Sequence, residues 1–320
     1  MRKLLLSFSI FFSLTFFSKI QGQDVSDVLS TGLDATSDYL GAYMKPLGET
    51  IGINMNSGWI NAGHPMGLGR FELRVTVPMT FVPEDMQTFD VNALPGWSGP
   101  DDAPTFLSGT GSTDDVSYNG SEIASAPKGI IGFNPLPPNF QLSVGLIKKT
   151  EIMIRYIPTL SFGRIETGLW GVGVKHDIGQ WIPVVKKLPF TISTSFAYSQ
   201  MDFSYDLEEI PGNDSDANNQ FIVLDGSGWN LGLQVSKKIP FLTAYLGGRY
   251  MSSNVSLLLE GDYDFDGEEF SDEELQDFEF SQFGAFAGFR LKLGVITIFA
   301  EGLISKYPTV STGLGIGFID

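Results

Sequence analysis

The sequence predicts an all-β fold, an antiparallel transmembrane β-barrel, from three observations. The first is a strict alternation of apolar and polar residues, which is clearest from Arg70 to Phe81. Because successive side chains of a strand point to opposite faces, one face of this segment is as apolar as lipid and the other is charged. The second is the return of this pattern down the chain after a predicted export signal, and the third is the absence of cysteine.

The expected barrel has about 10–12 strands, with up to about 14 possible, and it carries a short N-terminal helical plug. The high counts of glycine (37) and phenylalanine (26) fit small lumen-facing residues and aromatic girdles at the membrane surfaces. A soluble two-sheet sandwich is the alternative, since it would bury the same apolar faces in its core.

Residues 1–22 are predicted to be a secretory signal peptide. Arg2 and Lys3 give it a positive start, and residues 4–17 form an apolar run broken only by serine and threonine. Gly22 offers a small residue before the cleavage point. The alternative is a retained membrane anchor, but the run is shorter than the roughly 20 residues that a spanning helix needs.

The next segment, residues 23–67, breaks the strand pattern. Apolar residues recur at three- and four-residue steps from Asp24 to Lys45, which predicts an amphipathic helix. Pro46 and Gly48 are expected to end this helix, and Ile51 to Ile60 is predicted as a weak strand. Inside a barrel the segment would be a plug, whereas in a soluble domain it would be a surface helix.

Residues 68–320 are expected to form the barrel. Beyond residues 70–81, alternation predicts strands at residues 140–147, 150–159, 164–174, 190–205, 221–235, 241–257, 278–293, 295–303 and 310–318. Short or basic turns alternate with longer or acidic loops at residues 82–139, 206–220 and 258–277. Outer-membrane barrels place short turns in the periplasm, so these longer loops are expected outside.

This arrangement raises a question about where the chain starts. Counting back from a periplasmic C-terminus makes residues 70–81 an outward strand, so the N-terminal helix would begin outside. Either residues 23–67 form a plug ahead of about ten strands, or a further strand lies within residues 82–139. About twelve strands would hold a helix more comfortably, because the diameter of the lumen grows with strand number.

Several charged residues fall on the polar faces of the predicted strands and are expected to point into the lumen. They are Arg70, Glu72, Arg74, Arg155, Arg249, Arg290 and Glu301. A charge on the lipid face would cost roughly 2–4 kcal/mol at the middle of the bilayer. These residues would either form an ion-pair network that fills the barrel or set the selectivity of a pore.

One acidic stretch has the spacing of a calcium-binding EF-hand loop. Its candidate ligands are Asp262, Asp264, Asp266, Glu268 and Glu273, with Gly267 at the sixth position. The stretch before it, Val255 to Leu259, reads as a strand where an EF-hand has a helix. The alternative is a solvated acidic loop without a bound ion, and calcium is the one cofactor that the sequence suggests.

His64 and His176 are the two histidines of the chain. A hydrolase would need a histidine beside a serine and an orienting group. His64 falls in a Pro/Gly turn, and His176 falls in a basic turn beside Lys175 and Asp177, so we expect no enzyme. Trp181 in the same turn is expected to anchor at the membrane interface.

Four segments resemble an uncharacterised family of Gram-negative outer-membrane barrels. They are the helix ending Tyr43-Met44-Lys45-Pro46-Leu47-Gly48, the segment Asn56-Ser57-Gly58-Trp59-Ile60-Asn61, the first strand with Phe71, and Gly171 to Pro183. More distantly, a plug ahead of a mid-sized barrel is similar to the long-chain fatty-acid transporter family. That resemblance implies passive uptake of hydrophobic molecules, and no ligand-binding residue can be carried over.

The sequence therefore places the protein in the cell outer membrane and leaves three functional hypotheses. The first is passive transport of hydrophobic or small solutes, and the second is a structural or surface-binding barrel that acts through its outer loops. An outer-membrane hydrolase is the third. Expected partners are outer-membrane lipid, lipopolysaccharide, the barrel-assembly machinery and a small hydrophobic ligand. The net charge of −17 argues against nucleic acid.

Overall fold

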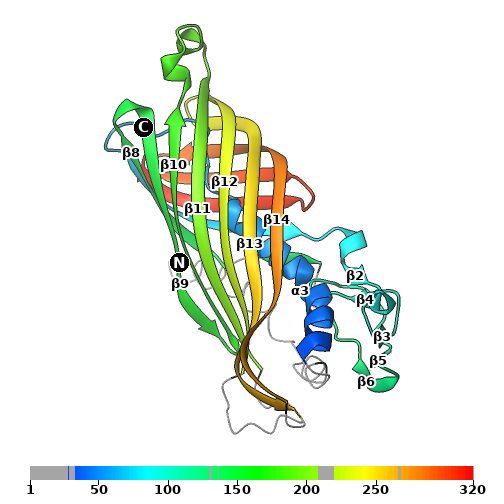
Figure 1. Ribbon diagram of the computed structural model, residues 1–320. Helices are drawn as coiled ribbons and strands as arrows, with labels where there is room; N and C mark the ends of the chain where they lie inside the picture. The colour runs from blue at the N-terminus through cyan, green and yellow to red at the C-terminus, as the bar shows by residue number, and fades with distance from the viewer. Residues whose placement is uncertain are drawn as a thin grey trace.

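The computed structural model describes residues 28, 33–129, 132–135, 137–207, 220–265 and 268–319. Ten antiparallel strands form a closed barrel, because the last strand pairs with the first as well as with its neighbour in sequence (Figure 1). The predicted β-barrel is confirmed, with a strand number at the low end of the expected range. The predicted signal peptide lies outside the described residues.

The barrel strands follow one another around the wall in chain order. They are β1 (Phe71–Phe81), β8 (Asn139–Leu146), β9 (Thr150–Phe162), β10 (Ile165–Asp177), β11 (Thr191–Asp206), β12 (Phe221–Lys238), β13 (Leu242–Phe265), β14 (Glu268–Leu293), β15 (Ile296–Ile304) and β16 (Thr309–Phe318). A short strand, β7 (Phe133–Pro135), pairs with the far end of β1 beyond β8. Each strand predicted within residues 68–320 corresponds to one of the ten, and β13 and β14 extend well past their predicted ends.

The outer face of the wall is apolar. Large aliphatic and aromatic side chains are exposed on it from every strand, among them Leu73, Ile154, Leu231, Leu246 and Ile316. The intervening residues point inward and are buried. Closure leaves no unpaired edge, and an apolar outer belt matches lipid rather than water. The barrel therefore spans a membrane, and the alternative of a soluble sandwich is wrong.

The two ends of the barrel differ. We call one the turn end: it holds the start of β1, the end of β16 and the connections after β8, β10, β12 and β14. The opposite end, which holds residues 82–138, is called the loop end. Short turns of outer-membrane barrels lie in the periplasm, so we expect the loop end to face the outside of the cell.

Helix α3 (Leu33–Asn56) runs down the lumen from the loop end (Figure 1). Near its start, Ser37 donates a hydrogen bond of 2.7 Å to the carbonyl of Leu275 on β14. At its last residue, Asn56 donates to the carbonyl of Ser252 on β13 at 3.3 Å. The lumen is therefore plugged ahead of ten strands, and the plug begins at the loop end. Among the described residues, no helix combines the length and apolarity needed to cross a bilayer.

The helix continues through two residues that were predicted to stop it. Pro46 and Gly48 lie inside α3, and much of the predicted strand at residues 51–60 is helical, so both predictions were wrong. The Thr50 hydroxyl donates to the carbonyl of Pro46 at 2.7 Å. The helix ends just before Gly58, whose φ of 67° is the left-handed conformation that commonly follows a helix.

Glycines inside the helix serve packing. A Cβ atom at Gly48 would overlap the ring of Phe278, and one at Gly52 would overlap the side chain of Ser253. The helix backbone therefore lies directly against β13 and β14, closer than any larger residue allows. This close approach explains how a barrel of ten strands encloses a helix.

Glu49 is buried on α3, and its carboxylate is bound by two residues of the loop end. Lys306, in the turn between β15 and β16, forms an ion pair with it at 3.0 Å, and the Tyr307 hydroxyl donates a hydrogen bond to the same carboxylate oxygen. Burial, and secondly the bond to Glu49, raise the pKa of Tyr307 above its usual value. Tyr307 therefore stays protonated and acts as a donor to the plug.

We call residues 82–129 the outer lobe. The sequence predicted a long loop here, but the segment is folded. The lobe contains η1 (Glu84–Met86), β2 (Thr88–Phe89), η2 (Val91–Ala93), β3 (Trp97–Ser98), β4 (Ala103–Pro104), β5 (Asp115–Tyr118) and β6 (Ser121–Ser125). It packs on the first half of α3, where the ring of Tyr39 lies 4.8 Å from that of Trp97. The backbone of Phe106 also donates to the carbonyl of Tyr43 at 2.9 Å. The lobe is therefore attached to the plug.

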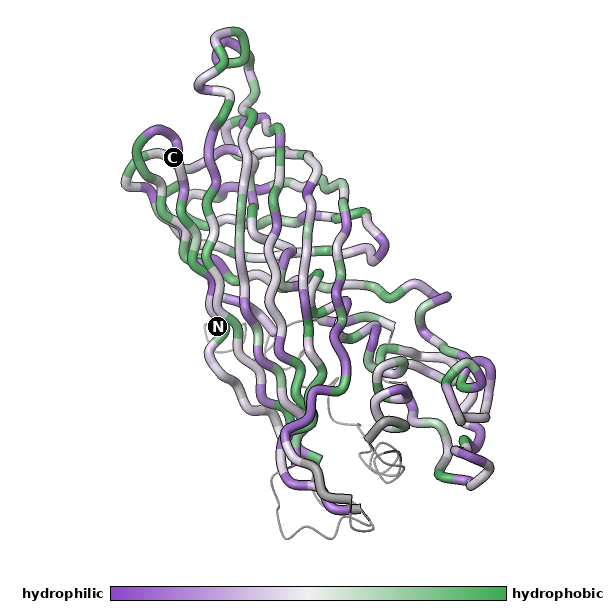
Figure 2. Tube along the Cα trace, viewed as in Figure 1, coloured by the Kyte–Doolittle hydropathy of each residue, from purple (hydrophilic) through white to green (hydrophobic). Residues whose placement is uncertain are grey.

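The predicted acidic loop at residues 258–277 is largely strand. β13 and β14 continue past the barrel wall as a hairpin, in which Leu259 pairs with Glu273 and Tyr263 with Phe270. Figure 2 shows hydrophilic positions gathered along this hairpin at the loop end. The prediction missed the pairing because acidic residues are poor strand formers on their own.

The packing of α3 can be tested by Gly52→Leu. The new side chain would overlap Ser253, and overpacking of this kind typically costs about 1–3 kcal/mol. We expect a lower unfolding temperature, measured by the shift in gel mobility on heating. The matched control is Gly302→Leu on β15, where a Cβ meets no atom within 4 Å. An equal loss of stability in both variants would contradict the proposed contact.

Candidate functional site

The candidate site is the half of the lumen nearest the turn end, where the plug leaves the helix. Residues 57–66, which we call the exit segment, connect α3 to β1 through the barrel interior. Trp59, Ile60, Asn61 and Ala62 are all buried. A non-helical segment inside a closed barrel must find hydrogen-bond donors for its carbonyl groups, because an unpaired buried carbonyl costs free energy. The barrel wall supplies these donors from charged side chains.

Arg155 on β9 binds the end of the helix. Its guanidinium donates to the carbonyl of Met55 at 3.3 Å and to that of Ser57 at 3.0 Å. It also contacts Oε1 of Gln141 at 3.2 Å and lies 4.1 Å from the centre of the Trp59 ring. One side chain therefore fixes the last helical carbonyls and the first large residue after them.

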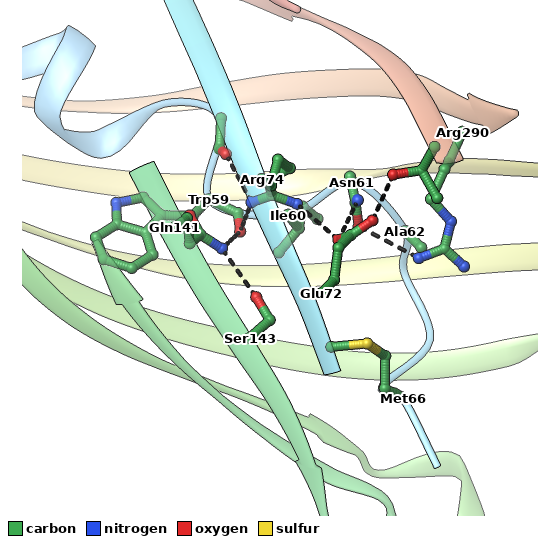
Figure 3. A network of polar contacts seen from close by, with 12 residues as sticks. Trp59, Ile60, Asn61, Ala62, Met66, Glu72, Arg74, Gln141, Ser143 and Arg290 are labelled. Atoms are coloured by element: carbon green, nitrogen blue, oxygen red, sulfur yellow. Dashed lines mark hydrogen bonds and ion pairs between the residues drawn. The ribbon is translucent and has the colours of Figure 1, made fainter. Parts of the chain in front are cut away.

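Arg74 on β1 binds the next two carbonyl groups (Figure 3). It donates to the carbonyl of Gly58 at 3.2 Å and to that of Trp59 at 2.8 Å. Glu72, two residues earlier on the same face of β1, lies 3.8 Å away, and the ring of Phe299 lies 5.0 Å from the guanidinium carbon. The charge of Arg74 is thus shared between a carboxylate and the plug backbone.

Glu72 joins the wall to the side chain of Asn61. It accepts hydrogen bonds from the Asn61 amide at 2.7 Å and from the Thr297 hydroxyl at 2.6 Å. The side-chain oxygen of Asn61 accepts from Arg290 at 3.4 Å (Figure 3). Arg290 also lies 3.3 Å from Nε2 of His64. The exit segment is therefore held by side chains as well as by its backbone.

Lys175 and Glu151 form a buried ion pair at 3.1 Å on neighbouring strands. Lys175 donates to the carbonyl of Ala62 at 3.0 Å, and Glu151 accepts from the backbone amide of Met66 at 2.9 Å. The pair therefore forms hydrogen bonds with both a carbonyl and an amide of the exit segment. Arg249 and Glu301 form a second buried pair at 3.0 Å on the other side of the lumen.

We call these wall residues the lumen collar. They are Glu72, Arg74, Glu151, Arg155, Lys175, Arg249, Arg290 and Glu301, all buried. The collar has five cations and three carboxylates, an excess of positive charge that would be costly inside the barrel if nothing compensated it. The carbonyl dipoles of the exit segment and the negative end of the α3 dipole point at it, and α3 has no basic residue in its last turn. The collar and plug are electrostatically complementary.

The lumen contains six of the seven charged residues that the sequence predicted to point into it. The structure places Glu72, Arg74, Arg155, Arg249, Arg290 and Glu301 in the lumen. Arg70, also expected there, is exposed at the turn end just before β1 begins. Lys175 was expected in a turn, but β10 runs on to Asp177 and turns Lys175 inward. Alternation with Val174 and His176 was the signal that could have found it, and alternation with Ile152 could have found Glu151.

The predicted calcium ligands lie on the β13–β14 hairpin. Asp262 and Asp264 are on β13, and Glu273 is on β14. This extended, paired backbone differs from the loop between helices that an EF-hand uses. Asp266 lies outside the described residues, and among the described ones no three acidic or histidine groups are clustered for a metal. Calcium binding stays a prediction.

His176 is fixed by neighbours at the turn end. The Trp181 indole nitrogen lies 3.0 Å from Nε2 of His176, and the Thr150 hydroxyl lies 2.8 Å from Nδ1. Since an indole nitrogen can only donate, Nε2 accepts and the ring proton is on Nδ1. The described partners of both histidines point to structural roles.

The grip of the collar can be tested by Arg155→Gln. The shorter neutral side chain leaves the carbonyl of Ser57 without its described donor and removes the contact with Trp59, so the free energy of unfolding should fall by about 2–4 kcal/mol. Arg70→Gln is the control, because it removes the same charge at an exposed site. Chemical denaturation in lipid vesicles measures both, and equal stabilities would refute the role assigned to Arg155.

Three solved structures have a similar but distant shape. The translocator domain of the autotransporter NalP from Neisseria meningitidis has a TM-score of 0.31 and 10% identity, covering 87% of this chain and 96% of that one. The attachment invasion locus protein Ail of Yersinia pestis has a TM-score of 0.28 and 11% identity, covering 78% and 98%. The toluene transporter TbuX of Ralstonia pickettii has a TM-score of 0.25 and 9% identity, covering 79% and 90%. With scores this low, none indicates what this chain binds.

Sequence comparison gives a family without a function. No curated protein matches the chain. A family of unknown function (DUF6588) matches residues 1–318. The closed wall, the apolar belt and the polar lumen are those of an outer-membrane β-barrel. The chain therefore belongs to the DUF6588 family of unknown function and is an outer-membrane β-barrel protein.

Proposed function

We propose that this protein is a plugged barrel that holds a folded lobe at the cell surface and acts through that lobe, rather than through an open pore. The observation that carries the proposal is the binding of the exit segment by the lumen collar. Arg155, Arg74 and Lys175 together bind five carbonyl groups of the plug. A plug held this way is a fixed part of the barrel.

Withdrawal of the plug would be costly. Each of these bonds contributes about 0.5–1.5 kcal/mol net, and bonds to charged groups contribute more. Withdrawal would also leave five cations facing three carboxylates without the carbonyl dipoles that now compensate them. The helix packs tightly as well, since Gly48 and Gly52 leave no space beside the wall. These terms favour a lumen that stays closed.

The attachment of the outer lobe to the plug supports a surface role. Tyr43 contributes its ring, its hydroxyl and its carbonyl to the contact, bonding to the backbone of Lys128 at 2.9 Å and to that of Phe106 at 2.9 Å. Because the lobe sits on the helix and the helix is clamped in the barrel, the lobe has a defined orientation at the loop end. A fixed, folded lobe suits recognition better than a mobile loop does.

Passive transport of hydrophobic or small solutes, the first hypothesis from the sequence, requires the plug to move. That hypothesis came from the distant resemblance of the sequence to long-chain fatty-acid transporters, and the family that matches the chain adds no support to it. Single-channel recording in planar bilayers separates the two hypotheses, because only a continuous lumen conducts.

We expect the full mature protein to insert without conductance steps. The double variant Arg74→Gln/Arg155→Gln should show stepwise or flickering conductance, since it removes the guanidinium groups from four plug carbonyls and leaves those of Ser57 and Gly58 without a described donor. Arg70→Gln is the control and should be silent. Regular steps from the unaltered protein would overturn the proposal in favour of transport.

Surface display has its own test. An epitope inserted between Asp101 and Asp102, both exposed in the outer lobe, should bind antibody on intact cells. The same epitope after Ile182 at the turn end should bind only after the outer membrane is permeabilised. The reverse pattern would contradict the orientation and a surface role for the lobe.

A further inference from the structure

Among the described residues of the turn end, the exposed charged side chains are all basic. The exposed or half-buried basic residues there are Arg70, Lys148, Lys149, Lys186, Lys187, Lys237, Lys238 and Lys292. The carboxylates described at this end, Glu72, Glu151 and Asp177, are buried. The chain as a whole carries a net charge of −17, so the charge of this basic rim is opposite in sign to that of the whole protein.

Each connection at this end places an exposed apolar side chain next to its lysines. Ile147, 65% exposed, precedes Lys148, and Ile239, 41% exposed, follows Lys238. Leu293 follows Lys292 and is also exposed. The longest connection, with η4 (Gly179–Trp181) and η5 (Val185–Lys187), exposes Trp181 (62%) and Val184 (72%) beside Lys186 and Lys187. The same pairing of charge and apolar surface recurs at all four connections.

From this repeated pairing we propose that the turn end is a binding surface for anionic phospholipid headgroups of the periplasmic leaflet. Apolar residues at the rim would continue the lipid-facing belt of the wall, and the lysines would reach the phosphate level with their stems along the acyl chains. Basic residues near an anionic membrane surface each strengthen binding. The proposal holds whether or not the barrel conducts.

Side-chain contacts hold the longest connection of the turn end in place. The Trp181 ring stacks on His176 with centroids 6.3 Å apart, and its nitrogen donates to that ring at 3.0 Å. Gln180 donates to the carbonyl of Lys148 at 2.7 Å, which joins two connections to each other. The backbones of these two connections, which carry four of the lysines, are therefore held in a fixed arrangement.

The turn between β8 and β9 has lysines at two positions where the backbone conformation favours other residues. In η3 (Ile147–Lys149), Lys148 and Lys149 both have positive φ values, 53° and 48°. Glycine or asparagine would adopt this left-handed conformation at lower cost. Two successive lysines in it indicate that the cations serve a purpose that the turn alone does not require. Lys149 also forms an ion pair with Asp177 at 2.9 Å, while the neighbouring Lys148 is exposed.

The proposal can be tested by native mass spectrometry of the full mature protein in detergent with added lipid. The probes are dioleoyl phosphatidylglycerol, which is anionic, and dioleoyl phosphatidylcholine, which has no net charge. We expect the unaltered protein to retain the anionic lipid preferentially. The variant Lys186→Gln/Lys187→Gln/Lys237→Gln/Lys238→Gln should bind it about tenfold more weakly, with the binding of phosphatidylcholine unchanged.

The control is Lys45→Gln/Lys128→Gln, which removes two charges at exposed lysines toward the loop end and is compared with Lys186→Gln/Lys187→Gln, which removes two at the turn end. The control should retain the anionic lipid like the unaltered protein, and heat-modified gel mobility should show that all variants are folded. Equal retention of the two lipids by the unaltered protein would overturn the proposal, and so would an equal loss in the control variant. Retention that is insensitive to salt would do the same, since exposed ionic contacts are screened.

Discussion

The need to satisfy the backbone of a chain segment sealed inside a barrel governs this structure. A helix leaves its last carbonyl groups without partners, and in the lumen no bulk water replaces them. Here the partners are Arg155, Arg74 and Lys175, which come from three different strands. The wall in turn depends on the plug, because the collar has more positive than negative side chains. Neither part is electrostatically complete without the other.

The second constraint is space, and it divides the lumen into two zones. Toward the loop end, α3 lies against apolar side chains such as Val255, Leu257 and Phe278, and burial of this surface provides the hydrophobic contribution. Glycines at the contact let the helix approach within backbone distance of the wall. Toward the turn end the helix gives way to the exit segment, and polar contacts replace apolar ones. The change from one zone to the other coincides with the end of the helix at Asn56.

The sequence was informative wherever one local rule decided the structure. Alternation found the ten strands and most of the charged lumen residues, because each inward position repeats every second residue. It failed for Arg70 and Lys175, which lie at strand ends, where one or two residues decide which way a side chain points. The helix was cut short at Pro46 and Gly48 because local propensity treats both as stops, whereas tertiary packing uses Gly48 as a point of contact. Neither the fold of the outer lobe nor its docking on α3 had a periodic signal.

A plugged lumen shifts the question of function to the two ends of the barrel, which differ in chemistry. The loop end carries the outer lobe and an acidic hairpin, while the turn end carries a lysine rim next to exposed apolar residues. Such an asymmetry matches a membrane whose inner surface offers phosphate groups to cations. The two ends are also linked mechanically. Because the lobe is fixed to the plug and the plug to the barrel, the orientation of the lobe depends on how firmly the membrane holds the barrel. Contacts at the periplasmic rim therefore contribute to the orientation of a surface on the opposite side.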